Sequence, residues 1–375
     1  MNPAGGGAPA APTKTGPHRH PPRGGAPERR STGFYRDSPL VLAQRELARV
    51  AALIERLLDE PDVTLPGEPA SAPTGAHHEA LRELVPRWHF AMLNDLSRNS
   101  LFEEAIKHAV RRGGHVLDIG SGSALLAMIA ARYGADLVTS CEIVRPIAQA
   151  AARIVADNGL ADAITVVNKS SDQLVVGGEL PERADLIVTE IVDCGLVGEG
   201  ILPSLRHARA HLLKPGGTII PKGARVLAAP VDSAYLWQLN RVGYACGFDV
   251  SHFNEFASRR YFPILLHAWP YRLLTTPVEV LSFDFAKDPL APGNKVVEVP
   301  IEESGTCHGI AFWFELFLDD KRVLTNEPNN RTGHWDQAFQ CLPKPLAVRA
   351  GTTVQLSVAH FDYLIYFTPL ARGQQ

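Results

Sequence analysis

The middle of the chain alternates short apolar runs with stretches in which apolar residues recur at helical spacing. HVLDIGSGS (115–123) is an apolar run that ends in a glycine-rich turn, and ALLAMIAARYGA after it has helical character. LVTSCEI (137–143) and ADLIVTEIVD (184–193) have the continuous apolar character of buried strands. PIAQAAARIVADNG (146–159) predicts a helix that Gly159 closes. Because buried strands that alternate with helices form parallel sheets, the pattern predicts a doubly wound α/β unit.

The pattern changes after LLKPGGTIIP (212–221). From there to the end of the chain, short runs rich in Val, Phe, Tyr and Trp alternate with polar residues and turn signals. Such alternation is typical of a β-sandwich or a β-barrel. We therefore expect an α/β unit over residues 78–221, followed by a β unit over residues 222–375.

The N-terminal part of the chain has a different character. Gly, Pro, Ala, Arg and His dominate its beginning, which buries too little apolar surface to fold, so we expect a disordered leader over residues 1–37. Ser38 then opens an apolar-periodic run, which predicts an amphipathic helix over residues 38–60 that docks on the main body or on a partner subunit. A linker rich in Pro, Gly and Ser follows it, so residues 38–77 form a helix and linker.

Composition and charge exclude several functional classes. The 375 residues carry a formal net charge of −3, so no global basic field favours nucleic acid as a partner. The five cysteines are scattered without C-x-x-C spacing, which argues against a disulfide framework and a metal site and favours a reduced, cytoplasmic compartment. No run of about 18 apolar residues could span a membrane, and the N-terminus lacks the apolar region of a secretory signal.

A candidate cofactor motif lies where the first strand meets its helix. Asp118, Gly120 and Gly122 form D-x-G-x-G, and glycine is needed there because a Cβ would block a ligand from the backbone N–H groups. The dinucleotide pattern G-x-G-x-x-G is incomplete, since Leu125 occupies its third glycine position. Glu142 closes the next strand about 20 residues on, where a carboxylate can accept both ribose hydroxyls.

Two glutamates point to the substrate. Glu190 and Glu199 bracket a short apolar turn in TEIVDCGLVGEG (189–200). A pair of carboxylates matches the charge and the two-sided donor fork of a guanidinium group. Acidic residues in loops are usually only solvated, but Glu190 ends an apolar strand at the carboxyl edge of the sheet, where ligands bind. Arginine, or a molecule shaped like it, is therefore the first candidate substrate.

Taken together, these motifs resemble the protein arginine methyltransferases, and most closely their monomethylating type III branch. The resemblance runs from about Trp88 to Phe367 and is carried by HFAMLNDLSRN (89–99), VLDIGSGS (116–123), VTEIVDCGLVGEG (188–200), GHWDQ (333–337) and VAHFDYLIYF (358–367). It implies a Rossmann-like class I methyltransferase domain followed by a β-barrel domain, with S-adenosyl-L-methionine as cofactor. It also implies a head-to-tail homodimer whose arm corresponds to residues 232–262.

The resemblance implies a role for each matching residue. The implied cofactor contacts are Arg98 at the carboxylate, Asp118, Gly120 and Gly122 at the methionine side, Glu142 at the ribose, and Asp172 or Ser171 at the adenine. The implied catalytic residues are Glu190, Glu199 and His334, and Met92 and Trp335 line the acceptor pocket. The chain departs from the family pattern at Gly333, usually Thr or Asp, and at Gly195, often a larger or acidic residue. We expect Gly195 to widen the pocket or to remove a charge beside it.

The acceptor is predicted to be free L-arginine. The composition, rich in Ala, Arg, Gly and Pro, is typical of high-GC bacteria, and the chain resembles the L-arginine Nω-methyltransferases of streptozotocin-type antibiotic biosynthesis. One alternative is a protein arginine methyltransferase acting on RGG-type peptides, such as Arg23-Gly24-Gly25 of its own leader. An alternative of another class is a non-catalytic dimeric scaffold. The choice between one and two transferred methyl groups stays open.

Overall fold

The computed structural model describes residues 85–370. The predictions made for the leader (1–37) and for the N-terminal helix and linker (38–77) lie outside the described residues.

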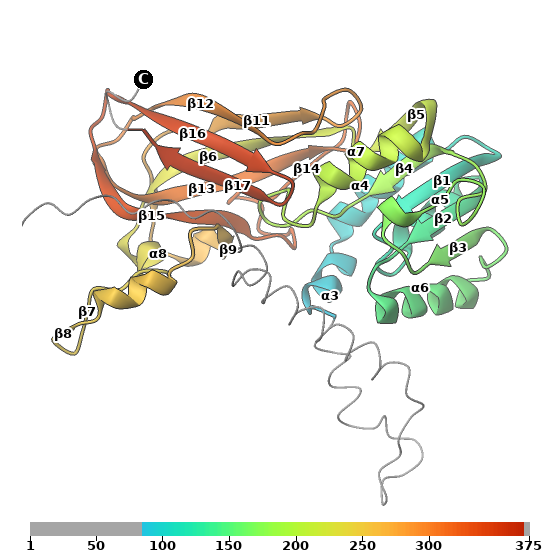
Figure 1. Cartoon of the computed structure of the whole chain (residues 1–375), viewed down its shortest axis with the longest axis horizontal. Coiled ribbons are helices and arrows are strands. Elements are labelled where there is room, and N and C mark those ends of the chain that lie inside the picture. Colours follow the sequence, from blue (N-terminus) through green and yellow to red (C-terminus); the bar gives the residue numbers. More distant parts are fainter. Residues whose placement is uncertain (1–84, 371–375) are drawn as a thin grey trace, which may run out of the picture. The chain divides into compact units, whose positions relative to one another are not determined.

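Five parallel strands form one sheet in the order β3-β2-β1-β4-β5 (Figure 1). The strands are β1 (Gly114–Ile119), β2 (Ala135–Cys141), β3 (Ile164–Val167), β4 (Ala184–Thr189) and β5 (Leu213–Ile220). The strand order reverses between β1 and β4, so the carboxyl ends of these neighbours flank the position at which open α/β sheets bind ligands. The predicted doubly wound α/β unit is confirmed.

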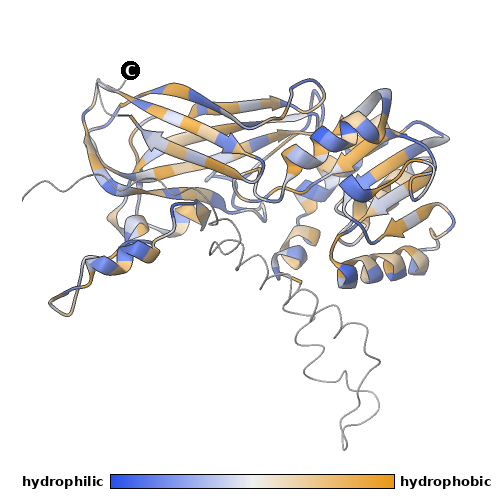
Figure 2. Cartoon of the chain, in the orientation of Figure 1, coloured by the Kyte–Doolittle hydropathy of each residue, from blue (hydrophilic) through white to orange (hydrophobic). Residues whose placement is uncertain are grey.

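The helices of this unit carry their apolar residues on one side. They are α3 (Trp88–Leu93), α4 (Leu96–Ala109), α5 (Leu125–Arg132), α6 (Arg145–Asp157) and α7 (Ile201–His211), with a 3-10 turn η1 (Ser171–Gln173). Along α6 the hydropathy colours alternate in Figure 2, and its buried residues are Ile147, Ala148, Ala151 and Val155. Gly159 follows α6 with φ 69°, a left-handed conformation that closes the helix as predicted. No helix within residues 85–370 is long and apolar enough to cross a membrane.

Antiparallel strands make up the rest of the described chain. One sheet contains β6 (Gly223–Asp232), β9 (Phe262–Ile264), β10 (Arg272–Leu273), β11 (Val278–Asp284), β13 (Gly305–Phe317), β14 (Val323–Thr325) and β15 (Gln337–Val348). A second sheet contains β12 (Gly293–Pro300), β16 (Thr353–Phe361) and β17 (Leu364–Pro369). The side chain of Gln340 bridges them, because it both donates to and accepts from the backbone of Phe367. The expected fold class, a parallel α/β sheet followed by antiparallel β structure, is confirmed.

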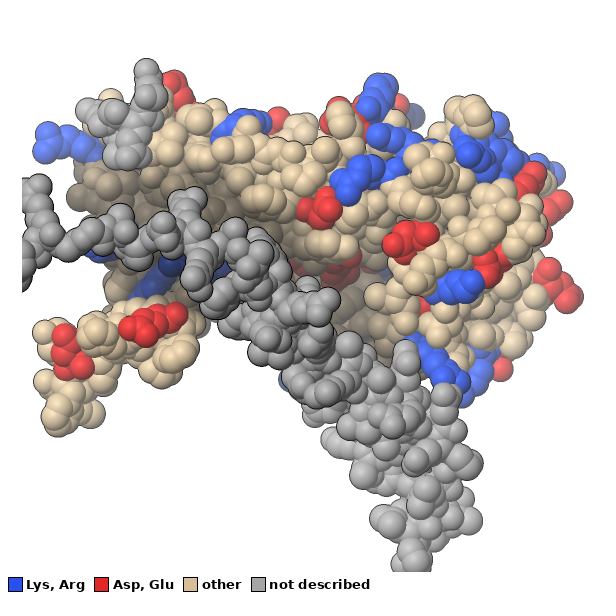
Figure 3. All heavy atoms as spheres, viewed as in Figure 1, with Lys and Arg blue, Asp and Glu red and all other residues tan. Residues whose placement is uncertain are grey.

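Within the predicted arm (232–262), short elements project away from the antiparallel sheets (Figure 1). They are β7 (Tyr244–Ala245), β8 (Phe248–Asp249) and η2 (Ser251–Phe256), whereas α8 (Ala234–Gln238), at the start of the arm, packs against the sheet through the fully buried Leu236. Large apolar side chains stay exposed here: Tyr244 by 76%, Phe248 by 73% and Phe256 by 79%. Figure 3 shows mainly uncharged residues on the visible face of this segment. Such exposure on consecutive turns is typical of a protein–protein contact surface.

Candidate active site

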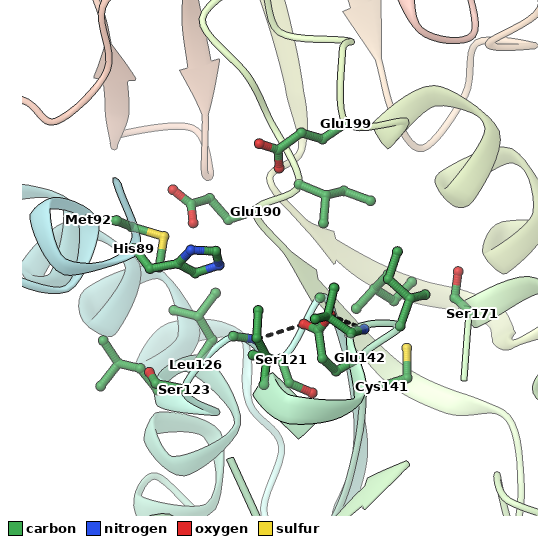
Figure 4. A pocket seen from close by; sticks show the side chains of 18 of the residues that line it. His89, Met92, Ser121, Ser123, Leu126, Cys141, Glu142, Ser171, Glu190 and Glu199 are labelled. Carbon is green, nitrogen blue, oxygen red and sulfur yellow. Dashed lines mark hydrogen bonds between the residues drawn. The ribbon is translucent and has the colours of Figure 1, made fainter. Parts of the chain in front are cut away.

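A cavity of about 540 Å³ lies at the carboxyl edge of the parallel sheet (Figure 4). Residues that follow β1, β2 and β4 form its floor, and α3 contributes one wall. We call it the cofactor cavity, after the role that the sequence predicts for its lining. In Figure 4, Met92 and Glu190 lie on one side of it and Ser171 on the other. The predicted site residues that line it are Met92, Arg98, Gly120, Gly122, Glu142, Ser171, Glu190 and Glu199.

The glycine turn after β1 holds one wall in place. Gly120 has φ 84°, and a Cβ there would come within 2.6 Å of the Ile191 side chain. The backbone N–H of Gly122 donates to Glu142 Oε2 at 3.2 Å, and that of Val144 donates to Glu142 Oε1 at 2.9 Å. The Glu142 carboxylate is therefore fixed at the cavity wall by two backbone donors (Figure 4).

Two predicted cofactor contacts do not line this cavity. Asp118 is 1% exposed and lies beneath the turn, where Ser140 Oγ donates to its Oδ2 at 2.8 Å. Burial raises the pKa of Asp118 to about 7 despite that hydrogen bond. Asp172 is exposed and does not line the cavity, whereas Ser171 is buried and lines it. The structure thus separates these two neighbours, which the sequence left as alternatives.

A second cavity of about 300 Å³ adjoins the first. Trp88, Met92, Glu190 and Glu199 line both cavities, so the two meet at the paired glutamates. We call this second one the acceptor cavity, after the role that the sequence predicts for the residues around it. Its remaining lining is Val192, Asp193, Cys194, Pro263, His334, Trp335 and Asp336. The structure thus brings His334 and Trp335 from before β15 to the loop that follows β4.

Both carboxylate oxygens of Glu190 are already engaged. Arg98 Nε donates to Oε1 at 3.2 Å and Arg98 Nη2 donates to Oε2, and the two side chains are only 3% and 5% exposed. His334 Nε2 lies 3.9 Å from Glu190 Oε1. Arg98, predicted from the resemblance as a cofactor contact, therefore also orients the first glutamate.

Glu199 differs from Glu190 in its contacts. Its carboxylate accepts no hydrogen bond and forms no ion pair with any other residue of the described chain. In Figure 4 it lies near the carboxylate of Glu190 at one end of the cofactor cavity. The Glu199 side chain is exposed to the open cavities, but partial desolvation between their walls, followed by the negative charges of Asp193, Glu190 and Glu142, raises the pKa of Glu199 to about 7. The group still reaches solvent through the cavities, so it is an accessible carboxylate without a cation.

His334 is oriented by Asp95, a residue that the sequence reasoning missed. Asp95 is the N-cap of α4, and its Oδ2 lies 3.1 Å from the backbone nitrogen of His334 and 3.0 Å from its Nδ1. Burial acts to raise the pKa of Asp95, but hydrogen bonds from the Arg98 N–H and from His334 outweigh it and lower that pKa. Burial lowers the pKa of His334, against the hydrogen bond to Asp95. A neutral His334 with Nδ1–H on Asp95 leaves Nε2 as a proton acceptor facing Glu190.

Trp335 is anchored to the loop that carries Glu190 and Glu199, called the glutamate loop below (190–199). Its Nε1 donates to the backbone oxygen of Val192 at 3.1 Å. Its ring lies 3.8 Å from the His334 ring and meets Phe314 edge-on at 5.4 Å. The indole therefore forms a fixed wall of the acceptor cavity.

The expectation that Gly195 widens the acceptor pocket is wrong. A Cβ on Gly195 would lie 2.5 Å from Tyr261 Cζ, so the space beside this glycine is filled by a ring, and Gly195 does not line the cavity. The Tyr261 hydroxyl donates to Asp193 Oδ2 at 2.8 Å. Asp193 stands within the glutamate loop and was visible in the sequence, but nothing local to either residue indicates that Tyr261 contacts it.

Comparisons with known proteins show which families this chain is similar to. The family model described as the arginine methyltransferase oligomerization subdomain matches residues 222–363, and that described as ribosomal protein L11 methyltransferase matches residues 100–226. The chain is 41% identical over 330 residues to the arginine N(omega)-methyltransferase of Streptomyces achromogenes subsp. streptozoticus, covering 88% of this chain and 91% of that protein. It is 31% identical to protein arginine N-methyltransferase 7 of Drosophila erecta over 74% of this chain, but spans only 46% of that longer protein.

Among solved structures, the Trypanosoma brucei PRMT1 enzyme-prozyme heterotetrameric complex with AdoHcy has a TM-score of 0.63. The match is 23% identical and covers 72% of this chain and 86% of that one. PRMT6 matches with a TM-score of 0.58 at 22% identity, over 76% of this chain and 98% of the other. At these identities the likeness shows a shared fold.

Proposed function

The chain belongs to the arginine N-methyltransferase family, and from that premise we propose that it transfers one methyl group to an ω-nitrogen of free L-arginine. Methylation of arginine with S-adenosyl-L-methionine follows from the family; the free amino acid and the single methyl group are what we propose. The observation that carries the proposal is Glu199, an accessible carboxylate without a partner at the junction of two cavities. A guanidinium group supplies the positive charge and the N–H donors that this carboxylate lacks.

The residues of the larger cavity fit the cofactor. The glycine turn leaves room for close approach to the backbone at Gly122, since nothing lies within 4 Å of a Cβ built there. Glu142 is held at the wall in position for ribose hydroxyls, and Arg98 is a buried cation at the same wall. When bound there, S-adenosylmethionine supplies an electrophilic methyl group. We propose Arg98, Gly120, Gly122, Glu142 and Ser171 as its contacts, with Asp118 supporting the turn from below.

The acceptor residues mainly align and polarise the guanidinium. This group is a weak nucleophile because its lone pairs are delocalised and its pKa exceeds about 12. We propose that Glu199 holds its N–H groups and draws positive charge away from the attacking nitrogen, with Glu190 beside it and Met92 and Trp335 as walls. His334 Nε2, 3.9 Å from Glu190 Oε1, then receives the proton that the methylated product releases.

Asp336 supports free arginine as the acceptor. Glu190 and Asp193, two of the four carboxylates that line the acceptor cavity, are engaged by Arg98 and Tyr261. Glu199 and Asp336 form no hydrogen bond or ion pair through their carboxylates in the described chain. Once Glu199 holds the guanidinium, Asp336 remains for a second positive charge. Free L-arginine carries an α-ammonium group, whereas an arginine inside a peptide has a neutral amide there.

The test compares L-arginine, Nα-acetyl-L-arginine and an RGG peptide as acceptors of labelled methyl groups. We expect L-arginine to have the highest kcat/KM, with a single methyl group in the product mass. Asp336→Asn should raise the KM for L-arginine by about 10-fold, since a charge-assisted hydrogen bond is lost, and leave Nα-acetyl-L-arginine unchanged. Asp157→Asn, at an exposed carboxylate on the last turn of α6, is the control. A preference for the RGG peptide would overturn the proposal.

The second candidate is a protein arginine methyltransferase acting on RGG-type peptides. It is favoured by the 31% identity to protein arginine N-methyltransferase 7 of Drosophila erecta. A non-catalytic scaffold would bind cofactor without transferring methyl groups to either acceptor. The paired glutamates and the glycine turn both line the cavities, which favours catalysis.

The setting of the enzyme is also part of the proposal. We propose a homodimer formed through the arm (232–262), supported by its exposed aromatic residues and by the oligomerization subdomain matched over residues 222–363. The five free cysteines support a cytoplasmic location, and the resemblance described above supports a place in antibiotic biosynthesis. We further propose residues 78–221 as the cofactor-binding domain and 222–375 as the β-barrel domain.

A further inference from the structure

The loop that carries Glu199 is folded around the carboxylate of Asp193. The backbone N–H groups of Gly195 and Gly198 donate to Asp193 Oδ1 at 3.2 and 2.8 Å. The Tyr261 hydroxyl donates to the other oxygen at 2.8 Å. One carboxylate thus ties together both turns of the loop and a residue 68 positions further along the chain.

Packing in this loop leaves little freedom. A Cβ on Gly198 would come within 2.3 Å of Asp193 Oδ2, and one on Gly195 within 2.5 Å of Tyr261 Cζ. Leu196 between them is fully buried and has φ 81°, a conformation that costs a leucine free energy and persists only because its surroundings impose it. Glu199 directly follows Gly198. Its backbone position is therefore set by the contacts of Asp193 and Tyr261 with this loop rather than by its own side chain.

Tyr261 is itself well anchored. Its ring meets Phe312 edge-on at 5.1 Å, within the core of the β unit. It directly precedes β9, which pairs with β15 through Ile264 and Gln337. Burial, and then the negative charge of Asp193, raise the pKa of the Tyr261 phenol, which therefore remains a hydrogen-bond donor. The Tyr261 ring thus connects the core of the antiparallel sheets to the glutamate loop.

We propose that Tyr261 and Asp193 are positioning residues that fix Glu199 against the guanidinium of the acceptor. This inference rests on the role proposed for Glu199, but not on whether the acceptor is free or part of a peptide. Neither residue need touch the reacting atoms. Tyr261 acts through Asp193, and Asp193 acts through the backbone of the loop and through its charge beside Glu199.

Geometry and charge can be separated by the choice of substitution. Tyr261→Phe keeps the ring and removes the hydroxyl anchor. Asp193→Asn keeps an oxygen for the two backbone donors but removes the charge. The charged groups that act on Glu199 are Asp193, Glu190 and Glu142, and Asp193 has the largest influence of the three on its pKa. In the pH profile of kcat/KM, Asp193→Asn should therefore move the acidic limb to lower pH. Tyr261→Phe should mainly lower the plateau value of kcat/KM and leave the position of the limb unchanged.

The experiment uses the full-length enzyme with whichever acceptor the wild type methylates. Tyr261→Phe should lower kcat/KM by about 10- to 100-fold, as expected for a displaced catalytic group, while the Kd of S-adenosylhomocysteine changes by less than about 2-fold. The control is Tyr133→Phe, because Tyr133 also donates to a carboxylate, Glu103 Oε1 at 2.9 Å, on the outside of α4. It should match the wild type.

A double substitution tests whether Tyr261 acts through Glu199. In a Glu199→Gln background, Tyr261→Phe should change the residual rate by less than about 2-fold, because the group that it positions is already lost. The inference would be overturned by wild-type kinetics in Tyr261→Phe, by a parallel loss of cofactor affinity, or by full additivity of the two substitutions. Transfer to RGG peptides alone would contradict free arginine as the acceptor without affecting this inference.

Discussion

At the scale of single residues, the two glutamates of the acceptor site differ in their surroundings. Glu190 is bonded through both oxygens to Arg98, whereas Glu199 has no partner in the described chain. A carboxylate without a partner in a partly enclosed cavity pays a desolvation cost that an arriving cation can offset. We therefore propose that Glu199 receives the acceptor and that Glu190, through Arg98, connects this site to the cofactor cavity.

Substitution should reveal this difference. Glu199→Gln is expected to lower kcat/KM for the acceptor by at least about 100-fold, the usual loss when a preorganised electrostatic group is removed. Its Kd for S-adenosylhomocysteine, measured by calorimetry, should stay at the wild-type value. Glu190→Gln should lower both kcat/KM for the acceptor and the affinity for S-adenosylhomocysteine, because Arg98 would be left buried at 3% exposure without its charged partner. Unchanged affinity for S-adenosylhomocysteine in Glu190→Gln would contradict a connection between Glu190 and the cofactor cavity through Arg98.

The pH dependence should report Glu199 directly. The raised pKa of about 7 means that the carboxylate is protonated below this pH and ionised above it. Only the ionised form attracts a guanidinium, so kcat/KM should fall about 10-fold per pH unit below pH 7 and level off above it. Glu199→Gln should abolish this limb in the residual rate. A limb that persists in this variant would assign the titration to another group.

At the scale of elements, the start of α4 organises the site from one side and the glutamate loop from the other. Asp95, as N-cap, accepts from the Arg98 backbone and from His334, while the Arg98 side chain one turn on holds Glu190. A single helical turn therefore orients both Glu190, which we propose to be catalytic, and His334. The loop depends in turn on glycines whose neighbours leave no room for a side chain.

Gly195→Ala tests the packing of that loop. Since the added Cβ would meet Tyr261 at 2.5 Å, we expect a stability loss of about 1–3 kcal/mol in denaturant unfolding, together with reduced kcat. Gly243→Ala is the matched control, because nothing lies within 4 Å of a Cβ at that position. Normal stability and faster turnover in Gly195→Ala would instead show that the pocket has room at this point.

At the scale of the whole molecule, the described chain joins two structural units through one acceptor cavity. Its walls come from α3, the loop after β4, the start of β9 and the segment before β15. Trp335 and Asn326 fasten the β unit to the glutamate loop, by hydrogen bonds to the backbone oxygens of Val192 and Cys194. This cavity therefore forms only when the segments of both the α/β part and the antiparallel part are packed together.

The arm supplies the prediction at this scale. Phe248→Asp combined with Tyr244→Asp should shift the protein from dimer to monomer in sedimentation velocity, because charges would replace exposed apolar side chains at the proposed interface. The monomer should stay folded, since neither ring is buried within the single chain. Val296→Asp, at a 54% exposed site on β12, is the control and should leave the dimer intact. An unchanged sedimentation coefficient in the double variant would place the interface elsewhere.

Much of this protein follows from local sequence. Apolar runs and helical spacing predicted the α/β unit and its antiparallel successor, because burial imposes a period on each strand and helix. The glycine turn and the paired glutamates were visible in the sequence for a chemical reason. Only glycine lets a ligand come close to the backbone, and carboxylates are the side chains that pair with a guanidinium, so each motif has recognisable residue types within a few positions. Gly159 marked a helix end for the same local reason.

Tertiary structure decided how these residues act. Arg98 meets Glu190 across 92 positions, Asp95 meets His334 across 239, and Tyr261 meets Asp193 across 68. No spacing rule encodes such pairs, because contacts between distant segments depend on how sheets and loops pack together. The same packing filled the space beside Gly195 and left Asp172 outside the cavity. The sequence by itself determined which chemistry the chain carries, and only the folded chain determined which carboxylate is free to perform it.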